Sequence, residues 1–545
     1  MPPGLAGFVA SGDEYAWDDE VAAVLGQLGQ TFALVPERTG APGTPHQRCT
    51  WFDTFDWRLY RAGLLLEYVP ARRGGELLLA PVGDPHQSLA RQPVASWRLT
   101  TPHPVADIPD GPLASRVSSV IFPRALLPVV TVAGTTSVTR LLNADGKTVA
   151  RLAVETPAVM SADRPRLPPR LAITGIRGYP GQARRAARIV AQAPGIQPAS
   201  DTVLADALAA GGRRPGDYSN KVDAPVKEAM PATEAIAVIL LRLLDTIEVN
   251  VDGVIRDIDT EFLHDLRVSV RRTRAALKLL GDALIAATAV TADELDRFTA
   301  DFKWLGDLTT PTRDLDVHLL EFGDMVAGLA AARPEDLEPF RSFLQRRRLR
   351  ASRALARGLR SPRFGALTAE WRKTLLAVRD AGSIGPRGGI PDRSGTTREL
   401  AADRTSRAFR RVARQGGAIT PTSPHESLHD LRKRCKELRY ALEFFAPLHD
   451  PAAYGKVVGD LKRLQDCLGQ FQDSEVQIAE IRALAEAMLA ADAAPAVTLL
   501  AMGEITSGIA ARQAAARADF ERRFAAFAGA DGQRRMAALL RGGTT

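Results

Sequence analysis

A long-range duplication constrains this chain more than any other feature of its 545 residues. The pattern H-D-L-R-x3-[KR]-x2-R-x-A-L begins at His264 and begins again at His429, 165 residues later. A second block recurs with it, because Leu-Gly-Asp at 305–307 and its downstream acids match Leu-Gln-Asp at 464–466 and the acids that follow. Repeats of this kind are supersecondary units that stack on one another. The sequence therefore predicts two similar folding units after residue 225.

The sequence of each copy predicts about four helices. They are one helix before the H-D-L-R helix, the H-D-L-R helix itself, one helix through the second block and a long helix after it. The Gly/Pro-rich stretch 381–396 separates the copies and is typical of a linker. We expect repeat one at about 228–380, the linker at 381–396 and repeat two at about 397–540. Together they would form an all-α domain of two pseudo-symmetric four-helix bundles.

Positive charge is concentrated in four helical segments. The chain has 71 basic and 63 acidic residues, a net charge of +8. Residues 264–278, 341–363, 404–414 and 429–439 hold 24 of the bases and only three acids. Within each segment the bases recur every three or four residues, which places them on one helix face. Like charges one turn apart repel by about 0.2–0.5 kcal/mol per pair, so these stripes favour a bound polyanion. The competing interpretation is a solvated face paired with carboxylates from other helices.

Several classes of protein are disfavoured. No run of 18 or more uncharged apolar residues predicts a membrane helix, and the first 15 residues lack the basic start of a signal peptide. Cys49, Cys435 and Cys467 are too few for a disulfide framework. The two repeated histidines lack matched Asp, Glu or Cys spacing, so no metal site and no cofactor is predicted. We expect a cytoplasmic protein without a membrane partner.

The H-D-L-R helix and its second copy, which continues as Leu-Arg-Tyr-Ala-Leu at 438–442, resemble the CHAD domain (conserved histidine α-helical domain) over about residues 228–540. The resemblance implies a pseudosymmetric helical domain that binds inorganic polyphosphate through a basic surface, in some members at polyphosphate granules. Carried over by position, the implied binding residues are His264, Arg267, Arg271, Arg274, His429, Arg432, Lys436 and Arg439. The charge stripes alone add Arg350, Arg353, Arg357, Arg407 and Arg411.

Arginine suits that ligand because its guanidinium grips phosphate oxygens with two parallel hydrogen bonds. Affinity built from many such contacts falls steeply as salt is raised. The two histidines have two open roles. They either donate to phosphate when protonated, or make a structural hydrogen bond near the start of their helix.

The first third of the chain predicts strands instead of helices. Short β-rich runs at 64–69, 76–80, 95–100, 129–132, 148–154 and 171–176 indicate an antiparallel sheet or barrel in an α+β domain at 1–205, followed by a linker at 206–227. The segment Cys-Thr-Trp-Phe-Asp-Thr-Phe-Asp-Trp-Arg-Leu-Tyr-Arg-Ala-Gly-Leu at 49–64 resembles the strand and turn of CYTH domains. That resemblance implies an eight-stranded tunnel in which basic residues hold a triphosphate and carboxylates hold a divalent metal.

The match departs from the family where the chemistry should lie. The family's opening E-x-E-x-K motif is absent, and its basic pair after the Gly-Leu turn is replaced by Leu66-Glu67-Tyr68. Divalent metals need several oxygen ligands in one place, so we predict a degenerate CYTH-like domain without catalysis. Five arginines are either anion ligands of a tunnel or scattered surface residues: Arg58, Arg61, Arg98, Arg140 and Arg151.

The leading hypothesis is thus a non-catalytic polyphosphate-binding protein. An enzyme, a metal-dependent triphosphatase or nucleotidyl cyclase, would need the missing carboxylates. General binding of nucleic acid or another polyanion is a third hypothesis. It is less favoured because Phe364, Phe409 and Tyr440 are the few aromatic residues near the stripes that could stack on bases. A fourth is oligomerisation through acidic surfaces.

Overall fold

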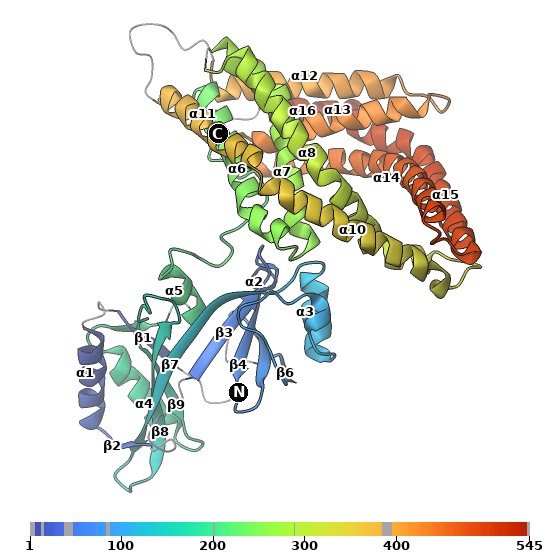
Figure 1. The fold of residues 1–545 in the computed structure, drawn as a ribbon. Helices are drawn as coiled ribbons and strands as arrows, with labels where there is room; N and C mark the ends of the chain where they lie inside the picture. The colour runs from blue at the N-terminus through green and yellow to red at the C-terminus, as the bar shows by residue number, and fades with distance from the viewer. Residues whose placement is uncertain are drawn as a thin grey trace. The chain divides into compact units, whose positions relative to one another are not determined.

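The computed structural model describes residues 6–11, 16–37, 47–82, 88–199, 202–287, 289–383 and 395–541. The chain forms two compact units, Met1–Ser219 and Asn220–Thr545. The first is built on a β-sheet and the second is helical (Figure 1). This is the predicted architecture of an antiparallel sheet domain followed by a helical domain.

The first unit contains one antiparallel sheet with the strand order β10-β1-β9-β8-β7-β3-β4-β5-β6, and β2 also pairs with β7. A polar-to-apolar alternation in strands such as β9 buries every second side chain. The strands are β1 Ala6–Ala10, β2 Ala33–Pro36, β3 Gln47–Asp53, β4 Leu64–Pro70, β5 Gly75–Pro81, β6 Ala90–Val94, β7 Leu127–Leu142, β8 Thr148–Val159, β9 Arg170–Gly175 and β10 Ile196–Pro198.

Helices cover this sheet through separate apolar cores. One core joins α1 and α4 to β1, β8 and β9, and another joins α2 and α3 to β3–β6. This β-rich fold is consistent with a CYTH-like domain. The helices of the unit are α1 Trp17–Gly29, α2 Arg58–Arg61, η1 Val105–Asp107, α3 Pro112–Ile121, α4 Pro180–Ala191 and α5 Val203–Ala209.

One predicted strand is wrong. Residues 95–100 are irregular, and the strand in this region is β6, which ends at Val94. Within this run, Trp97 stacks on His103 with ring centroids 3.8 Å apart. Trp97 is buried there. Tertiary burial of one large ring thus outweighs the local strand propensity.

The second unit consists of helices in both repeats. The first repeat contains α6 Ala232–Ile255, α7 Thr260–Ala286, α8 Ala292–Leu320, α9 Phe322–Ala327, η2 Pro334–Leu337, α10 Glu338–Leu359 and α11 Pro362–Ser383. The second contains α12 Thr397–Gly417, α13 His425–Phe444, η3 Ala446–Leu448, α14 Pro451–Ala490, α15 Ala496–Ala528 and α16 Ala530–Arg541. Most of the predicted linker 381–396 lies outside the described residues.

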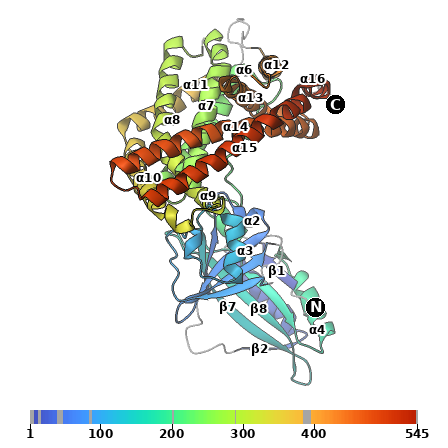
Figure 2. The same ribbon diagram turned by 90° about the vertical axis from the view of Figure 1, so that its right-hand side faces the viewer.

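Helix packing brings the repeated motifs together. Within repeat one, α7 packs between α6 and α8; within repeat two, α13 packs between α12 and α14. The repeats meet where α7 contacts α13 and α6 contacts α12. A further shared core joins α9 and α10 to α14 and α15, which lie side by side (Figure 2). The two H-D-L-R helices, α7 and α13, are therefore neighbours.

The start of α7 follows from its sequence. Asp259 is the N-cap residue, and its carboxylate accepts hydrogen bonds from the backbone N–H groups of Glu261 and Phe262. This satisfies two of the four N–H groups that a helix start leaves without a partner. The cap fixes the helix one turn before His264, so that His264, Arg267 and Arg271 follow on one face.

Candidate functional site

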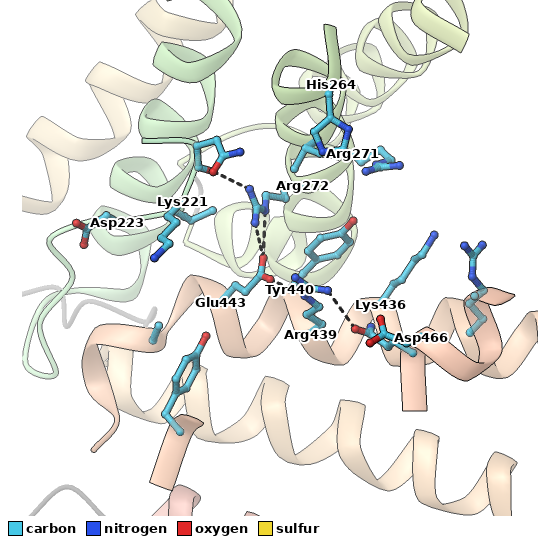
Figure 3. Close-up of a pocket in the computed structure, with 18 of the residues that line it drawn as sticks. Lys221, Asp223, His264, Arg271, Arg272, Lys436, Arg439, Tyr440, Glu443 and Asp466 are labelled. Atoms are coloured by element: carbon cyan, nitrogen blue, oxygen red, sulfur yellow. Dashed lines mark hydrogen bonds and ion pairs between the residues drawn. The ribbon is translucent and has the colours of Figure 1, made fainter. Parts of the chain in front are cut away.

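A cleft of about 1140 Å³ lies between the two H-D-L-R helices. Figure 3 shows His264 and Arg271 on α7 facing Lys436 and Arg439 on α13 across it. A second cleft of about 310 Å³ adjoins the first, since both are lined by His264, Arg271, Arg432 and Asp473. The two clefts therefore form one elongated site.

Six basic and four acidic side chains line the larger cleft, so the charge excess there is modest. Which of these basic side chains can bind an anion depends on which of them already form ion pairs. Glu443 accepts hydrogen bonds from Arg272 at 2.8 Å and from Arg439 at 2.7 Å, and thus occupies two of the arginines. Arg432 donates to Asp473 at 2.8 Å. These three arginines are already paired.

Arg271 and Lys436 differ from those three. Within the described part of the chain, neither side chain makes a hydrogen bond or an ion pair. Burial and the nearby Arg432 and Arg271 guanidinium groups lower the pKa of Lys436 to about 8. Burial is the larger cause, and the nearby Asp473 offsets the two guanidinium groups only in part, so the ammonium group lacks a full counter-charge here. An anion placed beside these side chains would relieve that deficit.

Arg267 has a structural role at the edge of the smaller cleft. Its guanidinium donates to the backbone carbonyl of Gly306 at 3.2 Å, to Thr309 Oγ1 at 3.0 Å and to Thr310 Oγ1 at 2.6 Å. Burial, then Arg271, lowers the pKa of Arg267. The contacts join the H-D-L-R helix to the second repeated block in α8, which explains why both blocks recur together.

The two histidines occupy different environments. His264 lines both clefts, and burial, then Arg313, lowers its pKa. His429 lines neither cleft, and its Nδ1 lies 2.8 Å from Gln472 Oε1. The repeats are therefore not equivalent at this position. His429 makes a structural hydrogen bond, whereas His264 is in a place to meet a ligand in its neutral form.

Several residues of the site were not predicted from the sequence. Arg272 and Glu443 are 171 residues apart and form a half-buried pair at the floor of the larger cleft. In the smaller cleft, His318 Nε2 lies 2.9 Å from Glu480 Oε2. The one available signal was the second repeated block, whose acids Asp314 and Asp473 both line the smaller cleft.

The other predicted binding residues lie outside both clefts. Arg274 is exposed on α7, and the remaining candidates are on the surfaces of α10 and α12. On α12, Arg407 pairs with Asp403 at 2.7 Å, and Arg411 is exposed. On α10, the three candidates are Arg350, Arg353 and Arg357, all exposed.

The segment of the first unit that resembles a CYTH domain has a structural role. Asp53 is buried, its Oδ1 accepts from the backbone N–H groups of Thr54 and Leu59, and its Oδ2 accepts from that of Tyr60. These contacts cap α2. Burial raises the pKa of Asp53 to about 6. This carboxylate therefore has three of its acceptor positions occupied by backbone.

Three of the five arginines considered for a tunnel have structural partners. Arg58 donates to Asp56 at 3.1 Å and Arg61 to the Tyr218 carbonyl at 2.6 Å. Arg151 donates to Glu37 at 3.0 Å. Arg140 lies directly opposite Arg151 in the pairing of β7 with β8.

The described residues contain neither a metal-binding cluster nor a membrane-spanning helix. Within the ranges given above, no group of three or more His, Cys, Asp or Glu side chains is arranged to hold a metal ion. In the same ranges, no helix combines the length and apolar character needed to span a membrane.

Comparison with known proteins identifies the helical unit. The family model of the CHAD domain matches residues 238–482. Among solved structures, a CHAD domain from the plant Ricinus communis is 24% identical, covers 57% of this chain and 96% of its own, and superposes with a TM-score of 0.46. PptA from Streptomyces chartreusis is 15% identical, covers 54% of this chain and 99% of its own, and gives a TM-score of 0.40. No curated protein matches. The family model shows that this chain carries a CHAD domain at residues 238–482.

Proposed function

We propose that the helical unit binds inorganic polyphosphate in the cleft between α7 and α13. The single observation that carries the proposal is the group of Arg271, Arg432 and Lys436, of which two lack an anionic partner among the described residues. A phosphate chain would supply the negative charge that this group lacks. The match to the CHAD family supports the choice of ligand, since the resemblance implies polyphosphate.

The chemistry of the cleft favours a chain of phosphates over a nucleotide. Its cations come from both H-D-L-R helices, and the cleft is elongated because the smaller one continues it. Tyr440 and Tyr454 are the only aromatic side chains among the described lining residues, and single-stranded nucleic acids require stacking surfaces. Contacts to phosphate oxygens alone suffice for polyphosphate.

Direct titration tests this proposal. Purified full-length protein is titrated with tripolyphosphate, long-chain polyphosphate and single-stranded DNA of equal charge over a range of salt concentrations. The triple variant Arg271→Gln/Arg432→Gln/Lys436→Gln should lose about 1000-fold or more in affinity, since three lost charge-assisted contacts at about 1.5 kcal/mol or more each sum to about 4.5 kcal/mol or more.

The matched control removes the same charge from elsewhere in the helical unit. Arg256, Arg297 and Arg333 are exposed and each pairs with a carboxylate, so Gln at these positions should leave affinity nearly unchanged. Equal loss in both triple variants would refute a specific cleft. Equal affinity for DNA would replace polyphosphate with a general polyanion as the ligand.

We also propose that the protein binds polyphosphate without cleaving it, and that it does so at polyphosphate granules. The use of Asp53 as a helix cap supports a non-catalytic first unit. Release of phosphate from tripolyphosphate in the presence of Mg²⁺ or Mn²⁺ would instead establish a triphosphatase. Imaging of a fluorescent fusion together with a polyphosphate dye tests the granule assignment.

A further inference from the structure

The outer face of α10 has a continuous row of arginines. Five of them follow one another at spacings of four and three residues, which places them on the same side of the helix. They span 14 residues, a length of about 21 Å at 1.5 Å per residue. All five side chains are exposed. We call this row the α10 arginine face, and its members are Arg346, Arg350, Arg353, Arg357 and Arg360.

These five arginines differ from their neighbours in having no partner. In the described ranges, none of the five side chains forms a hydrogen bond or an ion pair. On the inner side of the same helix, Arg348 pairs with Asp257 and Asp316, and just beyond its end Arg363 pairs with Asp301. The carboxylates in this part of the fold therefore pair with arginines other than those of the α10 arginine face.

The α12 row of Arg404, Arg407, Arg411 and Arg414 is partly neutralised. There Arg404 pairs with Asp282 at 2.9 Å and Arg407 pairs with Asp403 at 2.7 Å. Both rows alternate steps of three and four residues, yet two of the four arginines on α12 have fixed counter-charges, whereas none of the five on α10 has one among the described residues. Five like charges in a row repel one another, so the α10 arginine face gains most from an external polyanion.

We propose that the α10 arginine face is a second, exterior contact surface for long-chain inorganic polyphosphate, separate from the cleft. This inference rests on the proposed function, because the cleft holds another part of the same chain. None of the five residues lines either cleft. A phosphate chain that extends out of the cleft and is long enough to reach α10 would contact both surfaces.

The charge and the chemical groups of the α10 arginine face indicate which ligand it binds. The row consists only of guanidinium groups, each able to hold phosphate oxygens with a two-pronged hydrogen bond. The aromatic residues of α10, Phe340 and Phe343, are buried in the core and cannot stack on bases. A narrow row of cations without rings or carboxylates fits a linear phosphate chain better than a nucleic acid.

Binding at two surfaces has a measurable consequence. Once the cleft holds a long chain, contact with α10 becomes intramolecular and raises the overall affinity. A ligand too short to reach both surfaces gains nothing. Each additional phosphate contact also steepens the dependence of log affinity on log salt by about 0.7, so five contacts add about 3.5 for a single chain.

The experiment compares tripolyphosphate with long-chain polyphosphate on the full chain. The test variant changes all five residues of the α10 arginine face to Gln. A charge-matched control changes five exposed arginines that each have a carboxylate partner: Arg256, Arg297, Arg333, Arg522 and Arg534. The cleft variant Arg271→Gln/Arg432→Gln/Lys436→Gln completes the set. Circular dichroism checks that each variant is folded. If the variant with all five substitutions is unstable, the double variant Arg350→Gln/Arg353→Gln replaces it in the test.

The α10 variant should bind long-chain polyphosphate about tenfold or more weakly, with a salt slope lower by up to about 3.5, and should bind tripolyphosphate as the unchanged protein does. A long-chain affinity equal to that of the charge-matched control would overturn the inference. A larger loss for single-stranded DNA than for polyphosphate would also overturn it and assign the face to nucleic acid. If the cleft variant binds tripolyphosphate normally, the proposed function fails instead, so the two failures are distinct.

Discussion

Lys436 provides a quantitative test of the cleft. Burial and the neighbouring Arg432 and Arg271 lower its pKa from the ordinary 10.5 to about 8. A bound phosphate chain would restore the pKa toward its ordinary value, so that binding would take up a proton at higher pH. If the complex stays protonated, affinity falls about tenfold between pH 7 and pH 9, because the protonated fraction of the free lysine falls by that factor.

Two measurements check this linkage. Calorimetric titration in buffers of different ionisation enthalpy should give an uptake of about 0.5 proton per complex at pH 8. His264 lines the same cleft and its pKa is lowered in the free protein, so the Lys436 variants, and not the uptake alone, assign the proton. In Lys436→Arg the affinity should stay high across the range, and in Lys436→Gln it should be low throughout. A tenfold fall that persists in Lys436→Arg would refute the reasoning, as would a flat profile in the unchanged protein.

The same shift affects stability with the opposite consequence. A lowered lysine pKa means that the unfolded chain binds the proton more tightly than the folded protein does. The free energy of unfolding of the ligand-free protein should therefore rise as pH increases from about 8 toward 10.5. The contribution is about 1 to 2 kcal/mol, because a partly exposed side chain realises only part of the 1.4 kcal/mol per pKa unit.

Three further changes have defined outcomes. Glu443→Gln leaves the half-buried Arg272 without its counter-charge and should lower the free energy of unfolding by about 3 kcal/mol in chemical denaturation followed by helical circular dichroism; a loss below 1 kcal/mol would contradict this. Gly253→Ala places a methyl group against the ring of Phe262 and should cost about 1–3 kcal/mol in the same assay, whereas Ala at the uncrowded Gly455 should not. Asp53→Ala removes three backbone contacts and should speed amide hydrogen exchange in α2 by about tenfold or more, with exchange in α7 unaffected.

Much of the fold could be predicted from the sequence because its signals are local. The repeated H-D-L-R motif and the helical spacing of its bases indicated helices, and the short β-rich runs of the first third indicated an antiparallel sheet, both of which the structure contains. The exception at residues 95–100 has a non-local cause, since Trp97 in this run stacks on His103. Strand propensity does not register such a contact.

The existence of two basic H-D-L-R helices, their duplication and the positions of their charges along each helix all follow from the amino-acid sequence. Which of these charges remain available depends on the packing of the folded chain. Glu443 neutralises Arg272 from 171 residues away, Asp403 neutralises Arg407 on α12, and the equivalent row on α10 has no such partner among the described residues. The physical reason is that a helical period specifies the direction of a side chain relative to its own axis. The counter-charge it meets depends on which other helix packs against that face.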